Sequence, residues 1–356
     1  MEGAPAAVTI DGSQGEGGGQ IVRTSLALSV LLGTELTLFN IRAGRPKPGL
    51  QAQHLTAVRA AASVAHAKVE GGAIGSTAIQ FAPRGLHPGH YLFDVAELSG
   101  SAGSVSLVYQ TVLLPLAFAG APSTITLRGG THVPWSPPYD FVSQIFLRTL
   151  EPLGIEASLE LRQAGYYPPG GGLLAGSIQP AAVLQPLDLT QRGPLQRLTA
   201  FVRTSNLPGH VSERMAARIT GRLPLRKLHV DVSEVPARSP GAFCLLVADY
   251  KGAVAGFDGL GELRKAAEKV ADEAIDAYEA FERTGAAVDR HLADQLLLPL
   301  ALAAGSSRFT PDAVTEHLLT NAAVVQQFLP ACAIDIRGKK GQPGTVEVAG
   351  IGLQRA

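Results

Sequence analysis

Short runs of apolar residues along the chain predict alternating strands and helices. The segment 6–11 alternates weakly between apolar and polar residues and 37–41 forms a second short apolar run, so both are predicted to be strands. The stretches 21–32 and 51–64 have the length and apolar content of helices. The first ends at Gly33, a residue type common just past helix C-termini. The N-terminal region is therefore predicted to be an α/β unit.

This order of elements recurs twice. An apolar helix ending at Gly120 leads into a strand, a loop and a helix over 140–150, and a similar helix ending at Gly305 leads to a helix over 318–329. The two later copies share Pro-Leu-Ala-x-Ala. Gly33 and Gly120 are 87 residues apart, whereas Gly120 and Gly305 are 185 apart. The surplus of 98 residues in the second gap predicts an insertion.

The insertion is placed at 186–281 and is predicted to be a smaller α/β domain. It contains two predicted strands and a helix rich in Ala, Glu and Lys, at 195–203, 243–250 and 263–281. The fold class is therefore α/β (α+β), in which residues 1–185 and 282–356 form a large domain of three α/β units around a shared core. Such an architecture does not by itself identify an activity.

Composition narrows the class of protein. Apolar residues make up 46% of the chain and charged residues 17%, as in globular proteins, and a net charge of +0 argues against a protein that coats nucleic acid. Cys244 and Cys332 form no disulfide framework or zinc motif, which fits a reducing cytoplasm. No signal peptide is expected at 1–10. The apolar runs near 104–121 and 292–304 contain prolines and are too short to span a bilayer, so they are predicted to be buried helices.

The glycine-rich stretch Asp11–Ser25 is the leading candidate for a ligand site. Its five glycines precede the first helix, where exposed N–H groups and the helix dipole favour an anion such as phosphate. Arg23 could bind phosphate and Glu16 could hold a metal. The stretch is not a Walker loop, because no Gly-Lys-Ser/Thr follows, and Gln20 occupies the third glycine position of GxGxxG. A flexible turn before a core helix is an equally good interpretation of this stretch alone.

Two further segments offer cations and polar groups. The loop after the second strand places Arg42, Arg45 and Lys47 between prolines, and arginine forks suit phosphate oxygens, although a solvated loop is the plain alternative. Gln53 and His54 open the next helix, and a capping role suits His54 better than catalysis.

Polar residues also mark the later copies. Gln110 follows the small-residue loop 99–104 within an apolar run and needs a polar partner, from a ligand or from backbone. His132 lies in a glycine-proline loop beside Pro134, which could lie against a flat ligand. Three polar residues share one side of the third-copy helix at i, i+3 and i+4, namely His291, Asp294 and Gln295.

His317 begins the last long helix and lies off its apolar stripe. A helix N-terminus lowers the pKa of a histidine, and the neutral imidazole is the nucleophilic form. The same helix end attracts phosphate, so phosphorus is the expected electrophile. A simple helix cap is the alternative interpretation.

Six motifs together resemble those of the RNA 3′-terminal phosphate cyclases: GSQGEGGGQIVR, IRAGRPKPGLQAQHLTAV, SAGS with Gln110, GGT, HLADQLLLP and HLLTNAAVVQQFLP. They cover residues 8–180 and 288–330 with their spacing kept. The resemblance implies three repeats like the C-terminal fold of translation initiation factor three and a smaller thioredoxin-like inserted domain. It also implies a ligase that uses ATP and a divalent metal, Mg²⁺ or Mn²⁺, on RNA with a 3′-terminal phosphate, in the cytoplasm, away from membranes and as a possible homodimer.

The mechanism that the resemblance implies has three steps. His317 takes AMP from ATP, AMP passes to the RNA 3′-phosphate, and the neighbouring 2′-hydroxyl closes a 2′,3′-cyclic phosphate. By position in the family motifs, Glu16 holds the metal and the phosphate-binding residues are Arg23, Arg42 and Arg45. The implied nucleotide-binding residues are Gln53, Gln110, Pro134, His291, Leu292, Ala293, Asp294 and Gln295.

Three alternatives stay open at this stage. His132 is a rival nucleophile, because it follows Gly120 by 12 residues as His317 follows Gly305. The chain could be a non-catalytic cyclase-like ribosome-assembly protein, although such relatives lack the nucleophilic histidine. It could also be an adenylyltransferase acting on another phosphorylated nucleic-acid end, such as a DNA terminus.

Overall fold

The computed structural model describes residues 7–98 and 102–354, so positions 99–101 of the predicted small-residue loop lie outside the described residues. The elements predicted in the N-terminal region are confirmed to within a few residues. They are β1 (Val8–Asp11), α1 (Gly19–Leu32), β2 (Leu36–Phe39) and α2 (Ala52–Ala65), followed by β3 (Lys68–Glu70) and β4 (Ile79–Ala82). Gly33 caps α1 in the left-handed conformation, with φ of 63°, which glycine adopts at little cost. The strands form a sheet in the order β1-β2-β4-β3.

The next part of the chain contains a second sheet, ordered β5-β6-β8-β7. Its elements are β5 (His90–Asp94), a 3₁₀ helix η1 (Ala96–Leu98), α3 (Val105–Ala117), β6 (Ser123–Gly129), β7 (Ala157–Gln163) and β8 (Gly172–Ile178). The helix predicted over 140–150 is present but irregular, because a π-helical segment interrupts it. It runs through α4 (Tyr139–Phe141), η2 (Val142–Phe146) and α5 (Leu147–Leu150), and ends in a 3₁₀ turn, η3 (Glu151–Leu153).

A third sheet, ordered β15-β16-β14-β9, combines a short strand with the C-terminal region. Its elements are β9 (Asp188–Leu189), α8 (Arg290–Leu302), β14 (Ala304–Phe309), α9 (Glu316–Phe328), β15 (Ala333–Arg337) and β16 (Thr345–Ile351). In all three sheets the first two strands are parallel, and the fourth strand pairs antiparallel with both the second and the third. The interpretation of these segments as copies of one initiation-factor-like unit stays a prediction.

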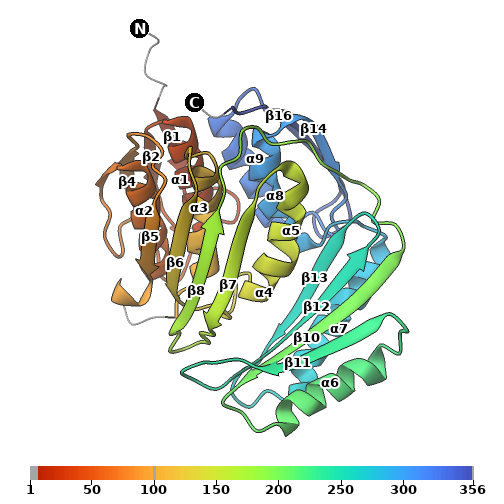
Figure 1. The fold of residues 1–356 in the computed structure, drawn as a ribbon. Helices are drawn as coiled ribbons and strands as arrows, with labels where there is room; N and C mark the ends of the chain where they lie inside the picture. The colour runs from red at the N-terminus through yellow and green to blue at the C-terminus, as the bar shows by residue number, and fades with distance from the viewer. Residues whose placement is uncertain (1–6, 99–101, 355–356) are drawn as a thin grey trace.

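The chain between β9 and α8 forms a fourth sheet, ordered β11-β10-β12-β13. Its elements are β10 (Leu195–Ser205), α6 (His210–Arg222), β11 (Leu228–Glu234), β12 (Gly241–Tyr250), β13 (Val254–Leu260) and α7 (Ala267–Thr284). Helices α6 and α7 lie together on one side of this sheet, with a hydrophobic cluster of their own (Figure 1). The domain limits and the thioredoxin-like character of this segment stay predictions, and β9, within the predicted insertion, pairs with β14 outside it.

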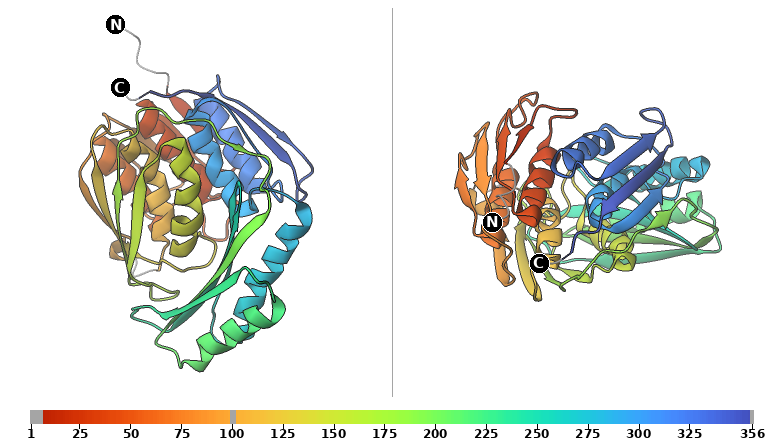
Figure 2. Two further views of the ribbon diagram at one scale, coloured as in Figure 1. Left: turned by 45° about the vertical axis from the view of Figure 1, so that its right-hand side comes forward. Right: turned by 90° about the horizontal axis from the view of Figure 1, so that it is seen from above.

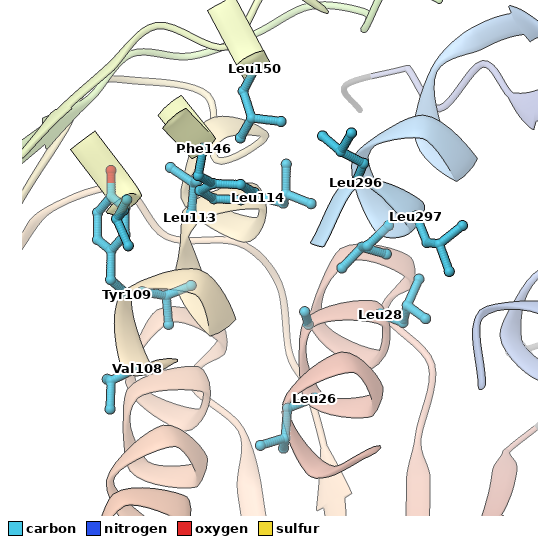
Figure 3. Packing of buried hydrophobic residues seen from close by; sticks show 14 of the residues in the cluster. Leu26, Leu28, Val108, Tyr109, Leu113, Leu114, Phe146, Leu150, Leu296 and Leu297 are labelled. Carbon is cyan, nitrogen blue, oxygen red and sulfur yellow. The ribbon is translucent and has the colours of Figure 1, made fainter. Parts of the chain in front are cut away.

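Helices rather than sheets form the centre of the larger part of the molecule. Seen from above, the strands at the N-terminal and C-terminal ends of the chain lie on opposite sides, with helices between them (Figure 2). Buried side chains of α1, α3 and α8 meet there, among them Leu28, Leu114 and Leu297 (Figure 3). The two apolar runs near 104–121 and 292–304 are the buried helices α3 and α8, as predicted. Among the residues described, no helix has the length and apolar character needed to cross a membrane.

Candidate functional site

The starts of three helices from distant parts of the chain meet at one polar site. Gln20 lies in the first turn of α1, Asp294 in the second turn of α8 and His317 in the first turn of α9. Gln20 Oε1 lies 2.9 Å from His317 Nδ1, and Gln20 Nε2 donates a hydrogen bond of 2.6 Å to Asp294 Oδ2. The packing of α1 against α8 and α9 therefore brings the predicted nucleophile into contact with the glycine-rich stretch.

His317 presents one ring nitrogen to the protein. Nδ1 lies between two acceptors, Gln20 Oε1 and Glu16 Oε2, the latter 2.7 Å away. The side chain is 52% exposed, so the imidazole is accessible while its Nδ1 edge is held. Nε2 makes no hydrogen bond within the part of the chain that the structure describes. This is the arrangement expected of a ring that reacts through Nε2.

The direction of the His317 pKa shift corrects the expectation from helix position. The Glu16 carboxylate beside Nδ1 raises the pKa of His317, and this effect outweighs burial and the nearby Arg23. The prediction of a lowered pKa was wrong, because a carboxylate in contact acts more strongly than the partial charge of a helix end. The carboxylate lies in another part of the sequence, 301 positions before the histidine.

Glu16 connects the histidine to the cationic loop. One carboxylate oxygen pairs with the Arg45 guanidinium, while Oε2 is buried and has no hydrogen bond of good geometry among the described residues. His317 first, and Arg45 after it, lower the pKa of Glu16, so it is a carboxylate at neutral pH. Arg42 is half-buried and donates to the carbonyls of Lys47 and Gly49 (2.7 and 3.0 Å), so it also holds its own loop together.

Glycines allow this close approach. A Cβ on Gly15, where φ is 51°, would overlap the Thr320 hydroxyl, and a Cβ on Gly18 would come within 3.0 Å of the Arg45 guanidinium. Gly18 is also the N-cap of α1 and supplies no side-chain cap. No side chain within residues 7–98 and 102–354 caps the first N–H groups of α1, which are therefore suited to an anion.

A pocket lined by Gln20, the residue that contacts His317, collects several of the predicted residues, although His317 itself does not line it. Gln110 from α3 and Gln295 from α8 hydrogen-bond to each other at 2.5 Å and line this pocket together with Gln20, Arg23 and Asp294. Burial lowers the pKa of Arg23 to about 10, and the nearby Asp294 charge offsets part of that shift. Burial raises the pKa of Asp294 to about 6, and His317, His291 and Arg23 offset part of that shift. The remaining pocket residues are Thr24, Ala27, Thr111, Leu113, Leu114, Phe146, Leu298, Pro299 and Asn321.

Other predicted nucleotide-binding residues are not placed in this pocket. Gln53 Oε1 accepts a hydrogen bond of 3.0 Å from the backbone N–H of Ser104, which is a structural role. Leu292 and Ala293 are fully buried, so only their backbone could reach a ligand, whereas His291 is exposed at the start of α8. Pro134 is half-buried and does not line the pocket.

His54 has the structural role that its position suggested. Its Nδ1 accepts a hydrogen bond of 3.2 Å from the Gln51 N–H and completes a capping box at the start of α2. Burial lowers the pKa of His54 to about 3, so the ring is neutral. Its other edge lies against Gly19, where a Cβ would overlap the ring.

His132, the rival nucleophile, is a buried structural residue. Nε2 lies 2.8 Å from Asp140 Oδ2 and Nδ1 lies 2.8 Å from the Thr131 hydroxyl, so both ring nitrogens are engaged. The ring is completely buried and packs edge-on against Phe243 of β12. An attack by His132 would require this arrangement to open.

We therefore expect His132→Ala to lower the stability of the protein. It should leave intact the transfer of AMP from ATP to the protein that the family resemblance implies. Removing one member of a buried pair leaves Asp140 without its partner and is expected to cost about 3–5 kcal/mol of unfolding free energy. Denaturant melts would measure this loss, and His132→Ala/Asp140→Ala should recover part of it, because the stranded carboxylate is removed as well. Unchanged stability in His132→Ala would contradict this interpretation.

Gln20 and Asn321, for which no role was predicted, complete the site. Asn321 Nδ2 donates a hydrogen bond of 2.7 Å to the Asp294 carbonyl, and Asn321 Oδ1 accepts one of 2.7 Å from the Thr24 hydroxyl. Both residues are buried polar groups in helices, and a buried amide requires partners. Both residues also lie within the family motifs, but neither signal says which partners the amides choose.

The fold and the site define an α/β protein in which a half-exposed histidine, a carboxylate and arginines surround a glycine-rich helix start. A family model described as RNA 3′-terminal phosphate cyclase matches residues 14–334. The chain belongs to this family.

Several curated relatives carry that name. The protein of Trichormus variabilis is 47% identical over 326 residues, covering 90% of this chain and 94% of its own. That of Methylococcus capsulatus is 46% identical and covers 96% of both chains, and that of Pyrobaculum neutrophilum is 43% identical over 97% of this chain and 99% of its own. Among solved structures, the enolpyruvyl transferase NikO from Streptomyces tendae aligns with 11% identity over 99% of this chain and 82% of its own, at a TM-score of 0.22, which is too low to support an argument.

Proposed function

We propose that this chain converts an RNA 3′-terminal phosphate to a 2′,3′-cyclic phosphodiester in an ATP-dependent reaction that passes through a covalent histidine–AMP intermediate. The observation that carries the proposal is the way in which the His317 ring is held. Its Nδ1 edge is held by Gln20 and Glu16 at the glycine-rich helix start, where Glu16 also pairs with Arg45, and its Nε2 makes no hydrogen bond to the described residues. A nucleophile held in this way, next to a site suited to phosphate, is what nucleotidyl transfer requires.

The proposed reaction has three steps. Nε2 of neutral His317 attacks the α-phosphorus of ATP, forming an N–P bond as the bond to pyrophosphate breaks. An oxygen of the RNA 3′-phosphate then attacks the same phosphorus, which returns the imidazole and gives an RNA–adenylate anhydride. The 2′-hydroxyl attacks the terminal RNA phosphorus, loses its proton and expels AMP. This last attack is intramolecular and gains from proximity.

The residues present fit a divalent cation that would be held jointly by the protein and by the nucleotide phosphates. Glu16 Oε2 is a buried carboxylate oxygen that lies 2.7 Å from His317 Nδ1 and keeps lone pairs free for a cation. The described residues include no group of three or more His, Cys, Asp or Glu side chains able to hold a metal. Magnesium sites of this kind complete their shell with substrate phosphates and water. A bound Mg²⁺ or Mn²⁺ would neutralise phosphate charge, and Glu16 would hold it.

The pocket side chains would receive the nucleotide. We propose that the Gln110–Gln295 amide pair meets the base and that Arg23, Arg42 and Arg45 contact the phosphates, with Asp294 lining the pocket. Gln53, Pro134 and the segment His291–Gln295 stay predicted neighbours of the nucleotide.

The cytoplasmic location and the homodimer also stay predictions. We further propose that the large domain consists of three repeats and that the inserted domain begins after β9.

The direct test is to incubate the protein with α-labelled ATP and Mg²⁺ or Mn²⁺, denature it and count the label that stays on the polypeptide. Addition of RNA with a 3′-phosphate should discharge the label and yield RNA lighter by one water. A DNA strand with a 3′-phosphate has no 2′-hydroxyl, so with DNA the reaction would stop at the adenylate. Absence of label with wild-type protein would overturn the proposal, and faster discharge by DNA than by RNA would favour the alternative acceptor.

Arg45→Ala should slow adduct formation about 10²-fold, the usual cost of removing one donor from a developing anion. Arg45→Lys should recover only part of this, because lysine lacks the fork. The pair with Glu16 is half-exposed and contributes at most about 1 kcal/mol, so the melting temperature should change little. Lys47→Ala, an exposed cation in the same loop, serves as the matched control and should keep the wild-type rate.

A further inference from the structure

The Gln20 side chain connects three helices, and beyond its contact with His317 it has no part in the steps described above. It is buried at the start of α1, with only 7% of its surface exposed, and its two amide atoms reach different elements. Oε1 faces Nδ1 of His317 on α9, and Nε2 donates to the Asp294 carboxylate on α8. The amide therefore lies between the nucleophile and a fixed acceptor.

The carboxylate determines which way the amide faces. With Nε2 toward Asp294, the hydrogen bond is 2.6 Å and charge-assisted. The reverse orientation would set the amide oxygen against a carboxylate oxygen and lose that bond. Asp294 is itself held, because the Asn321 amide donates to its backbone carbonyl and Thr24 donates to Asn321. Oε1 of Gln20 is consequently presented to His317 as an acceptor.

An acceptor at Nδ1 requires the imidazole proton to be on Nδ1. A neutral histidine free in water favours the other tautomer, with its proton on Nε2, and that tautomer has no lone pair on the accessible nitrogen. Glu16 Oε2 also lies near Nδ1, but its geometry for a hydrogen bond is poor and its partner oxygen is paired with Arg45. Of the two acceptors, Gln20 is the one whose position is set from both ends.

We propose that Gln20 is a positioning residue that, oriented by Asp294, holds His317 in the Nδ1–H tautomer and so leaves the Nε2 lone pair free for attack. The inference rests on the proposed function, because it gives the reason why Nε2 is the reacting atom. It resembles the way in which a carboxylate or carbonyl bonded to one ring nitrogen fixes the tautomer of metal-binding and catalytic histidines.

The test measures the tautomer in the nucleotide-free protein, apart from activity. In protein labelled with ¹⁵N-histidine, at a pH where His317 is neutral, the wild-type spectrum should show protonated Nδ1 and unprotonated Nε2. His317→Ala identifies the signals. Gln20→Met keeps the length of the side chain and removes both amide atoms. It should move the ring towards the Nε2–H tautomer and slow adduct formation about 10- to 100-fold, the usual cost of losing such a partner, with little change in the KM for ATP.

Two variants keep the test decisive. Ser29→Ala removes a buried hydrogen bond further along α1, to the Thr34 carbonyl, without touching the imidazole or the pocket, so it should keep the wild-type tautomer and rate. Gln20→Asn replaces Gln20→Met if the latter does not fold, because its shorter amide cannot reach both neighbours. An unchanged His317 tautomer in a folded Gln20 variant would overturn this inference and leave the proposed function standing. A wild-type protein that forms no adduct would overturn the function.

Discussion

His317→Ala is expected to abolish labelling of the protein by α-labelled ATP, a fall of about 10⁴-fold or more, as when an essential nucleophile is removed. The variant keeps Arg23, Arg45 and the glycine-rich helix start, so it should still bind ATP without forming the covalent bond. The label would be measured on the denatured polypeptide, and ATP binding separately by calorimetry.

The matched control for this variant is His210→Ala. His210 is also an exposed histidine in the first turn of a helix, α6, so its removal tests whether any such histidine matters. It should label like the wild type. His317 is half-exposed, so its removal should cost little stability, and an unfolded His317→Ala protein would point to a structural role. Label kept in His317→Ala and lost in His132→Ala would reverse the assignment of the nucleophile.

Much of the fold follows from local pattern. The apolar stretches that became α1, α3 and α8 were predicted from length and composition, and Gly33 ended the first as its conformational freedom suggests. The π-helical interruption at Val142–Phe146 was not predicted, because that segment contains no glycine or proline to mark an irregularity. Its irregular backbone depends on how the segment packs against its neighbours, which local sequence does not record.

The site, too, was predictable only where it depends on local sequence. The position of His317 at a helix start could be predicted, since it depends on neighbours in the chain. The sign of its pKa shift could not, because it depends on Glu16, which approaches only when α1 packs against α9. The same packing gives Gln20 its partner 297 positions away. Equally, nothing local distinguished the buried, fully bonded His132 from the half-exposed His317.

Glu16→Gln should slow adduct formation about 10²-fold at pH 8 and less at pH 6. The amide loses the charge that is proposed to hold the metal, which lowers the rate at every pH. Attack needs the neutral imidazole, so the rate rises with pH through the folded pKa of His317, which Glu16 raises above its ordinary value of 6.5. Removing the carboxylate moves that midpoint to lower pH. The ratio of wild-type to variant rates should therefore widen as pH rises.

Stability gives an independent check on the same pair. The lowered pKa of Glu16 contributes stability that is present above 4.5, its ordinary value, and is lost as pH falls through the folded pKa. The raised pKa of His317 contributes stability that is present below 6.5 and is lost as pH rises through the folded pKa. Glu16→Gln should therefore destabilise most between these two values, by no more than about 1 kcal/mol, since both groups are partly exposed.

Glu316→Gln is the matched control for both measurements. Glu316 is the immediate neighbour of His317 in sequence, yet its carboxylate pairs with Lys340 at 2.6 Å. If the contact with Nδ1 sets the pH dependence, neutralising Glu316 should leave the midpoint of the rate profile in place, whereas neutralising Glu16 should lower it. Equal shifts in the two variants would mean that general negative charge near α9, rather than the Glu16 contact, tunes the histidine.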